Sequence, residues 1–160
     1  MGFWDVAEKV AKGVGNAGKK AVVQAQERQY QQNKNAVIGG KAISQWEGGW
    51  QSIGILSNAN LSPYNKSVGL YRARLNGRVV YIGRAVEFSN GGFRKRLSDY
   101  RRGSDSSRKH GSGQKMNAHN EQLHIDILVT GDDATAAELA KKLEILLVGK
   151  YKPEWNKQLV

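Results

Sequence analysis

The dipeptide Asn76-Gly77 restricts the fold more than any other feature of the sequence. It separates two runs, residues 68–75 and 78–83, in which Val, Ile, Leu and Tyr are frequent. Asn and Gly tolerate the positive φ that tight hairpin turns require, and β-branched and aromatic residues favour strands. The sequence therefore predicts an antiparallel β-hairpin over residues 68–83.

The chain after this hairpin supplies the other elements of a small domain. Residues 93–102 predict a helix with Phe93 and Leu97 facing inward, and residues 123–129 alternate apolar and polar residues as a strand does. Asp132 and Asp133 suit the N-cap and first turn of a helix from residue 134 to about 150, which Pro153 ends. We expect residues 103–118, rich in Gly, Ser, Lys and Arg, to form a mobile basic loop.

The order of these elements, β-β-α-β-α, predicts an α+β fold. We expect a small antiparallel three-stranded sheet flanked by helices, formed by residues 67–160 and preceded by an N-terminal helical extension. Residues 1–35 have a helical stripe of small apolar side chains that Gly13, Gly15 and Gly18 weaken, so a partner or the main domain should stabilise it. In the connecting segment, residues 36–66, Trp46 and Trp50 are four apart, and a short helix would pack both on the main domain.

The composition narrows the partners and excludes several kinds of site. The formal net charge is +11 over 160 residues, which favours a polyanionic partner such as nucleic acid. No cysteine is present, which excludes disulfides, thiolate zinc sites and cysteine nucleophiles. No apolar run approaches the ~18 residues of a membrane span, and the start of the chain lacks a secretory pattern. We expect a cytoplasmic protein.

Residues with chemical potential recur at fixed spacings around the predicted hairpin. Two glycine–tyrosine tripeptides, Gly69-Leu70-Tyr71 and Tyr81-Ile82-Gly83, stand one on each predicted strand, and further positions follow them: Arg84, Arg96, Tyr100, Glu144 and Asn156. Arg96 and Tyr100 lie four apart and share a helix face. Glu144 is surrounded by apolar residues, so its carboxylate needs a metal ion or an arginine as partner.

Taken together, these residues resemble the GIY-YIG nuclease superfamily over about residues 67–157. The spacing is closest to that of the N-terminal nuclease domain of the bacterial nucleotide-excision-repair nuclease. The chain departs from that pattern at Leu70, which replaces Ile, in an insertion of about five residues around 87–92, and in its long basic loop. The resemblance implies a metal-dependent endonuclease that hydrolyses DNA phosphodiester bonds by a single-metal mechanism.

The resemblance also implies a role for each residue. Glu144 would bind Mg²⁺ or Mn²⁺, Arg84 and Arg96 would neutralise the phosphate, and Tyr71 would be the general base. Tyr81 and Tyr100 would position water or phosphate, and Asn156 would fix the end of the last helix. A tyrosine base needs its pKa lowered from about 10, which we expect the arginines and the metal to do.

Further basic residues are predicted to contact the nucleic-acid backbone without reading bases: Arg94, Lys95, Arg101, Arg102, Arg108 and Lys109. His119 is a candidate auxiliary proton carrier. His119 and His124 could also indicate a histidine-based metal nuclease, but no second ligand set accompanies them.

The register of the hairpin tests whether Tyr71 and Tyr81 share a site. A two-residue turn pairs Leu75 with Arg78 and puts the tyrosines on opposite faces. A three-residue turn with a bulge pairs Arg74 with Arg78 and puts Tyr71 opposite Tyr81. Because both tyrosines are assigned to one site, we expect the bulged turn.

Two other interpretations stay open at this level. The protein could be a non-catalytic nucleic-acid-binding module, or a nuclease toxin or effector whose N-terminal region serves delivery or partner binding. The sequence does not distinguish DNA from RNA, define the substrate structure or pathway, fix the oligomeric state, or explain residues 1–66, of which residues 1–35 could bind a protein partner.

Overall fold

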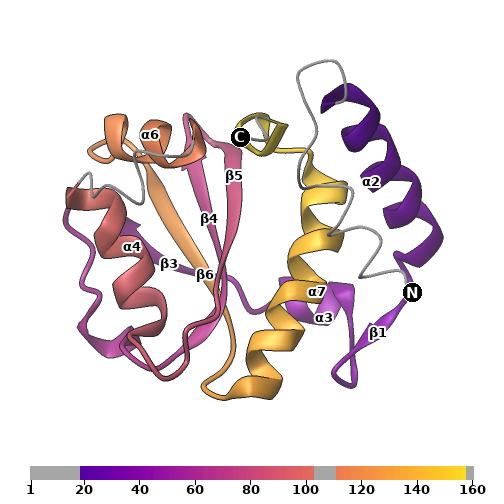
Figure 1. Cartoon of the computed structure of the whole chain (residues 1–160), viewed down its shortest axis with the longest axis horizontal. Helices are drawn as coiled ribbons and strands as arrows, with labels where there is room; N and C mark the ends of the chain where they lie inside the picture. The colour runs from indigo at the N-terminus through magenta and orange to yellow at the C-terminus, as the bar shows by residue number, and fades with distance from the viewer. Residues whose placement is uncertain (1–18, 103–110, 158–160) are drawn as a thin grey trace.

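The computed structural model of the chain describes residues 19–102 and 111–157 (Figure 1). In chain order the elements are α2 (Lys19–Asn33), β1 (Val37–Ile38), β2 (Lys41–Ala42), α3 (Ile43–Glu47), β3 (Gln51–Ile55), η2 (Ser62–Tyr64), β4 (Val68–Leu75), β5 (Arg78–Ala85), α4 (Gly92–Arg102), α6 (Gly111–Ala118), β6 (His124–Gly131), α7 (Ala134–Tyr151) and η3 (Glu154–Lys157). A central sheet has α4 and α6 on one face, and α7, with α2 beside it, on the other (Figure 1).

The central sheet is antiparallel and has four strands in the order β3-β6-β4-β5. The predicted α+β class and its three strands are confirmed, but the predicted strand number is wrong. The fourth strand, β3, comes from the connecting segment and pairs with β6 at the edge of the sheet. A bulge between Ser52 and Gly54 interrupts β3, so its sequence lacks the alternation that marks a strand.

The hairpin turn is the tight two-residue form, so the expected bulged turn is wrong. Asn76 and Gly77 have φ values of 53° and 80°, and Leu75 pairs with Arg78. A bulge nevertheless occurs further along the hairpin, because Arg74 pairs with Val79 whereas Ala73 pairs with Tyr81. The extra residue in β5 shifts the register by one and thereby exchanges the faces of the side chains that follow.

Two hydrophobic clusters fill the two faces of the sheet. Side chains of β4, β6, α4 and α6 form one cluster, which includes the fully buried Phe93, Leu97 and Met116. The other cluster joins the opposite face of the sheet to α7 and α3, through residues such as Leu143 and Trp46. Helix α7 begins as predicted, since the side chain of Asp133 accepts a hydrogen bond from the amide of Ala136.

Part of the predicted mobile loop is a helix, which corrects the prediction for residues 111–118. Helix α6 buries Gly113 and Met116, and the Asn117 side chain donates a 2.6 Å hydrogen bond to the Tyr100 carbonyl. The sequence of this segment has a single large apolar residue, so it carries no helical periodicity. Residues 103–110 lie outside the described part of the chain.

The N-terminal extension is helical over residues 19–33, and the stripe positions from 3 to 17 lie outside the described residues. Helix α2 lies along α7, where Tyr30 packs against the second cluster and Glu27 forms a 2.5 Å ion pair with Lys152. Of the two tryptophans, only Trp46 lies in α3, which ends at Glu47, but both pack against the second cluster.

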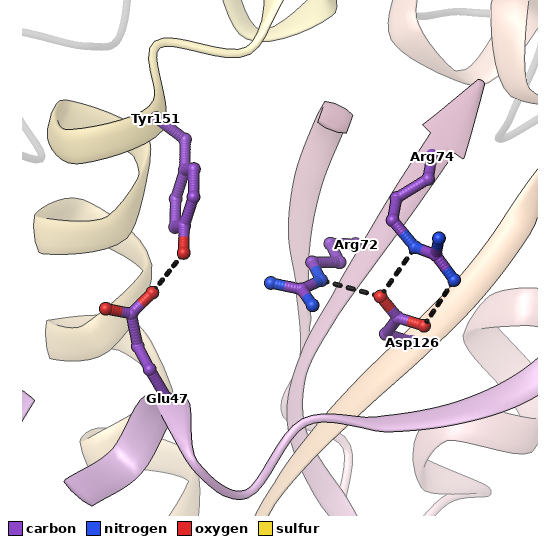
Figure 2. A network of polar contacts seen from close by, with 5 residues as sticks. All are labelled: Glu47, Arg72, Arg74, Asp126 and Tyr151. Carbon is purple, nitrogen blue, oxygen red and sulfur yellow. Dashed lines mark hydrogen bonds and ion pairs between the residues drawn. The ribbon is translucent and has the colours of Figure 1, made fainter. Parts of the chain in front are cut away.

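A polar network occupies one end of the face covered by α7 (Figure 2). Asp126 is almost fully buried and binds Arg72 at 2.7 Å and Arg74 at 2.9 and 3.1 Å. The guanidinium of Arg72 also lies 4.3 Å from the ring centre of Trp50. On the opposite side, Glu47 accepts a hydrogen bond from Tyr151, which joins α3 to the end of α7. Two arginines thus bind the Asp126 carboxylate inside the protein.

Candidate active site

Two tyrosine hydroxyls meet between the sheet and α4. The Oη atoms of Tyr71 on β4 and Tyr100 on α4 lie 2.5 Å apart, and both residues are buried. Their rings are 6.0 Å apart at 60°, an edge-to-face arrangement. Phe93 and Leu97, both fully buried, hold α4 against the sheet, so the helix presents Tyr100 to Tyr71 in a fixed position.

Tyr81 joins this pair from the neighbouring strand because of the bulge in β5. It pairs with Ala73, two residues from Tyr71, so both tyrosines are on one face and their rings are 6.1 Å apart. Gly83 lies directly opposite Tyr71, and a Cβ atom there would be 2.4 Å from both Cζ and Oη of Tyr71. The glycine of the second tripeptide therefore provides the space that the Tyr71 ring fills.

The three tyrosines sit in an environment that keeps them protonated. Burial raises the pKa of Tyr71 well above its ordinary value, Tyr100 and Tyr81 raise it further, and Arg96 opposes them. Burial also raises the pKa of Tyr81 and of Tyr100. Arg96 lowers the pKa of Tyr71 as expected, but desolvation outweighs its charge, so the pKa of Tyr71 in the free protein is raised and not lowered.

Arg96 lies one helical turn before Tyr100 and supplies positive charge to the cluster. Burial lowers the pKa of Arg96, but Tyr71, Tyr100, Glu87 and Tyr81 together raise it by more, so the guanidinium stays charged. Its Nη2 lies 3.6 Å from the Glu87 carboxylate, and 40% of its side chain is exposed. The charge can therefore reach a ligand from solvent.

Glu144 approaches the cluster from α7, the helix on the other face of the sheet. Its Oε1 lies 3.4 Å from Nη1 of Arg84 on the edge strand β5, and both side chains are about a quarter exposed. The carboxylate also raises the pKa of Tyr81 and of Tyr100, so its charge is felt beyond β5. The predicted residues thus meet around the edge of the sheet formed by β5, with the tyrosines on one side of β5 and Arg84 with Glu144 on the other.

The residues present fit a divalent cation held by a single carboxylate. No group of three or more His, Cys, Asp or Glu side chains suited to a metal occurs within residues 19–102 and 111–157. Mg²⁺ keeps several of its water ligands and often takes only one or two carboxylates from protein. Glu144, which is partly exposed and interacts electrostatically with Tyr81 and Tyr100, meets this requirement.

Asn156 binds the outer edge of β5 and not a neighbouring helix end. Its Oδ1 accepts a 2.9 Å hydrogen bond from the amide of Ile82, and its Nδ2 donates a 2.8 Å bond to the Ile82 carbonyl. The Asn156 side chain thus pairs with the backbone of the edge strand β5 at Ile82, between Tyr81 and Gly83, as a neighbouring strand would. Asn156 holds the backbone that carries the site.

The residues predicted to contact nucleic acid differ in their surroundings. Arg94 is exposed on the first turn of α4, and Arg102, with 68% of its side chain exposed, forms a 3.1 Å ion pair with Asp99. Lys95 forms a 2.6 Å ion pair with Glu87. Arg108 and Lys109 lie outside the described residues.

Arg101 was predicted to contact nucleic acid, but its guanidinium binds the protein's own backbone. Its Nε donates a 2.6 Å hydrogen bond to the Leu56 carbonyl, and its Nη2 donates to the Ala59 carbonyl. These bonds use the guanidinium to hold the segment after β3 against α4, so Arg101 has a structural role.

His119 comes directly after α6, and its side chain contacts residues other than the three tyrosines. Its Nδ1 is 2.9 Å from the Lys115 carbonyl and its ring is 5.3 Å from that of Trp155. These described contacts join α6 to η3, and none of them involves the tyrosines.

Sequence patterns did not predict that Ser112 and Glu87 lie near the tyrosine cluster. A hydrogen bond with Ser112 lowers the pKa of Tyr81, although burial raises it by more. Ser112 lies in a segment without periodicity, so no pattern pointed to it. Glu87 binds Lys95 and Arg96, and its position in the insertion after the second tripeptide was the available signal.

Comparison with known proteins gives a similarity in structure only. No family model matches the chain, and no curated protein is significantly similar to it. Two solved structures of the GIY-YIG N-terminal endonuclease domain of UvrC from Thermotoga maritima are similar to it, one bound to magnesium as its catalytic divalent cation and one a point mutant bound to its catalytic divalent cation. Each has 21% sequence identity to this chain and a TM-score of 0.41. Each alignment covers 59% of this chain, together with 88% of the mutant's chain or 89% of the magnesium-bound chain. Both belong to the family that the tripeptides and their spacing resemble.

Proposed function

We propose that the protein is a metal-dependent endonuclease that hydrolyses DNA phosphodiester bonds by a GIY-YIG mechanism, with residues 67–157 as the nuclease unit. One observation carries the proposal. Three tyrosines, an arginine and a carboxylate, supplied by β4, β5, α4 and α7, converge at the edge of one sheet. A binding module that cuts nothing has no requirement for two buried tyrosines, a partly buried third one and a carboxylate beside its basic surface.

Phosphodiester hydrolysis requires an activated water and stabilisation of negative charge on the phosphoryl oxygens. Glu144 is the residue that would hold a divalent cation, and that ion would supply positive charge to the phosphate and lower the pKa of a bound water. Arg96 and Arg84 provide further positive charge from the two sides of β5, and a guanidinium can bind two phosphate oxygens at once.

Tyr71 is the proposed general base, and its contacts define what proton removal requires. Burial keeps the hydroxyl protonated in the free protein. The Tyr100 hydroxyl at 2.5 Å can donate a hydrogen bond to the Tyr71 phenolate, and the Arg96 charge favours that phenolate. A substrate phosphate adds negative charge and opposes the phenolate, so transfer of a proton from water to Tyr71 would depend on the positive charge of Arg96 and of a divalent cation held by Glu144.

The proposal that the partner is a nucleic acid is based on the positive charge of the protein. The net charge of +11 and the exposed Arg94 and Arg102 on α4 suit a phosphate backbone, which RNA also has. No helix in the described ranges is long and apolar enough to cross a membrane. A cytoplasmic location and a protein partner for residues 1–35 are further proposals.

Plasmid nicking tests the function. Supercoiled DNA is incubated with the wild type, Glu144→Ala and Glu138→Ala, with Mg²⁺ or with a chelator. Glu138 lies on the same helix, 65% exposed, and pairs with Lys141, so its variant controls for loss of a surface carboxylate. Nicking that needs Mg²⁺ and Glu144 but not Glu138 supports the proposal. Binding without cleavage across several substrates and metals identifies a non-catalytic module.

A further inference from the structure

Glu87 bridges two cations of α4 that face solvent beside the tyrosine cluster. Its Oε2 lies 2.6 Å from Nζ of Lys95, and its Oε1 lies 3.6 Å from Nη2 of Arg96. All three side chains are about 40% exposed, so a ligand in solution can reach each of them. Arg96 also interacts electrostatically with Tyr71, Tyr81 and Tyr100, so this carboxylate lies at the edge of the candidate active site.

The loop that carries Glu87 is fitted closely to the start of α4. The Glu87 carbonyl accepts hydrogen bonds from the amides of Asn90 and Gly92. A Cβ atom at Gly91, which has a φ of +97°, would lie 2.6 Å from Cβ of Lys95. The loop therefore rests on the Lys95 side chain, and the position of the Glu87 carboxylate follows from the backbone of the loop.

A carboxylate held by an ammonium and a guanidinium has the recognition chemistry of a phosphodiester. Both anions present two oxygens to the donors, and both gain from the same pair of cations. An exposed ion pair of this kind is weak, since solvent screens it and two long side chains are ordered to form it. A nucleic-acid phosphate with additional contacts to the protein can therefore displace it.

We propose that Lys95 and Arg96 form a phosphate-binding subsite that Glu87 occupies in the free protein and leaves when nucleic acid binds. Glu87 thereby competes with the substrate: it lowers affinity for every phosphate-bearing ligand of this subsite and holds Arg96 in place until a substrate arrives. The inference rests on the proposed function for its substrate class, a nucleic-acid phosphodiester.

The test is a binding comparison that does not depend on cleavage. Affinity for a short fluorescein-labelled DNA duplex is measured by fluorescence anisotropy in the presence of a chelator for the wild type, Glu87→Gln and Glu138→Gln. The two variants make the same change in net charge, and Glu138 has an equivalent surface ion pair with Lys141. Thermal unfolding of each variant verifies that it is folded. A second pair, Lys95→Gln with and without Glu87→Gln, tests whether the effect passes through Lys95.

We expect Glu87→Gln to bind about fivefold more tightly than Glu138→Gln, the order expected for release of one exposed ion pair. We also expect the gain to shrink when Lys95 is replaced. Equal affinity of the two variants, weaker binding by Glu87→Gln, or an undiminished gain without Lys95 would overturn the proposal. Plasmid nicking is measured separately, so a protein that does not cut but binds more tightly without Glu87 refutes the nuclease proposal and retains the subsite.

Discussion

The ring of Tyr71 lies over Gly83, at the place that a side chain of residue 83 would need. A Cβ atom there would be 2.4 Å from Cζ and Oη of Tyr71 and 2.8 Å from Cε2 of Tyr81. Since Tyr71 is buried, neither ring can move aside without disturbing the first hydrophobic cluster.

Replacement of Gly83 by Ala is therefore expected to displace the Tyr71 hydroxyl. Overpacking of this kind costs about 1–3 kcal/mol of stability, and cleavage should fall by about tenfold or more because a small misplacement of a reacting group is costly. Urea denaturation and plasmid nicking measure the two effects. Gly48→Ala is the control, since its nearest contact for a Cβ atom is 3.5 Å. Unchanged activity in Gly83→Ala would show that the position of Tyr71 is not critical.

The raised pKa of Tyr71 predicts how stability depends on alkaline pH. In the unfolded chain the phenol ionises near about 10, whereas burial holds the folded pKa well above that value. The contribution is therefore fully present below the unfolded pKa and is lost as the pH rises toward the folded pKa.

The urea midpoints of unfolding of the wild type and of Tyr71→Phe test this linkage when they are measured at about pH 9, 10 and 11, a range centred on the pKa of an unfolded tyrosine. We expect the wild type to lose more stability than Tyr71→Phe above pH 10, since the variant has no proton to lose at this position. Parallel pH dependences of the two proteins would mean that Tyr71 ionises as easily in the folded state as in the unfolded one.

Asn156 is predicted to act through the backbone of β5. Asn156→Ala removes both hydrogen bonds to Ile82 and leaves an unpaired edge, at a cost of about 1–3 kcal/mol. Amide hydrogen exchange of Ile82 should accelerate, and kcat should fall more than KM rises, because Tyr81 and Arg84 are held by that segment. Persistent protection of the Ile82 amide would contradict this role.

Asp126 is predicted to stabilise the fold through its bonds to two arginines. Asp126→Ala leaves Arg72 and Arg74 without their buried partner, and such a loss destabilises a protein by about 3–5 kcal/mol. Equilibrium urea unfolding measures the change, with Glu138→Ala as the exposed control. If Asp126→Ala lowered the free energy of unfolding by less than the control does, the two arginines would have found other partners in the absence of the carboxylate.

Residues with local signals were predicted well. The strand over residues 68–75, α4 and the N-cap of α7 follow from turn residues, apolar spacing and a capping aspartate, and the structure has them. Strand β3 was missed because a bulge interrupts its pattern, and α6 was missed because tertiary contacts of Met116 stabilise a helix that its composition does not favour.

The sequence named candidate residues for the site but not the geometry that brings them together. Spacing selected Tyr71, Arg96 and Glu144, yet it gave no indication of the bulge that brings Tyr81 to the face of Tyr71. Nor could it indicate burial, which reverses the expected direction of the Tyr71 pKa shift. Register and desolvation depend on the assembled sheet and helices, so a linear pattern does not contain them.

The most direct measurement of the central claim is the ratio of nicking rates of Glu138→Ala and Glu144→Ala on one supercoiled substrate in saturating Mg²⁺. Loss of a charged group that stabilises a transition state costs about 10²–10³ in rate, so we predict that Glu144→Ala is slower by at least about a hundredfold, and that a chelator abolishes cleavage by both. Equal rates, or cleavage that persists without a divalent cation, would contradict a nuclease site built around Glu144.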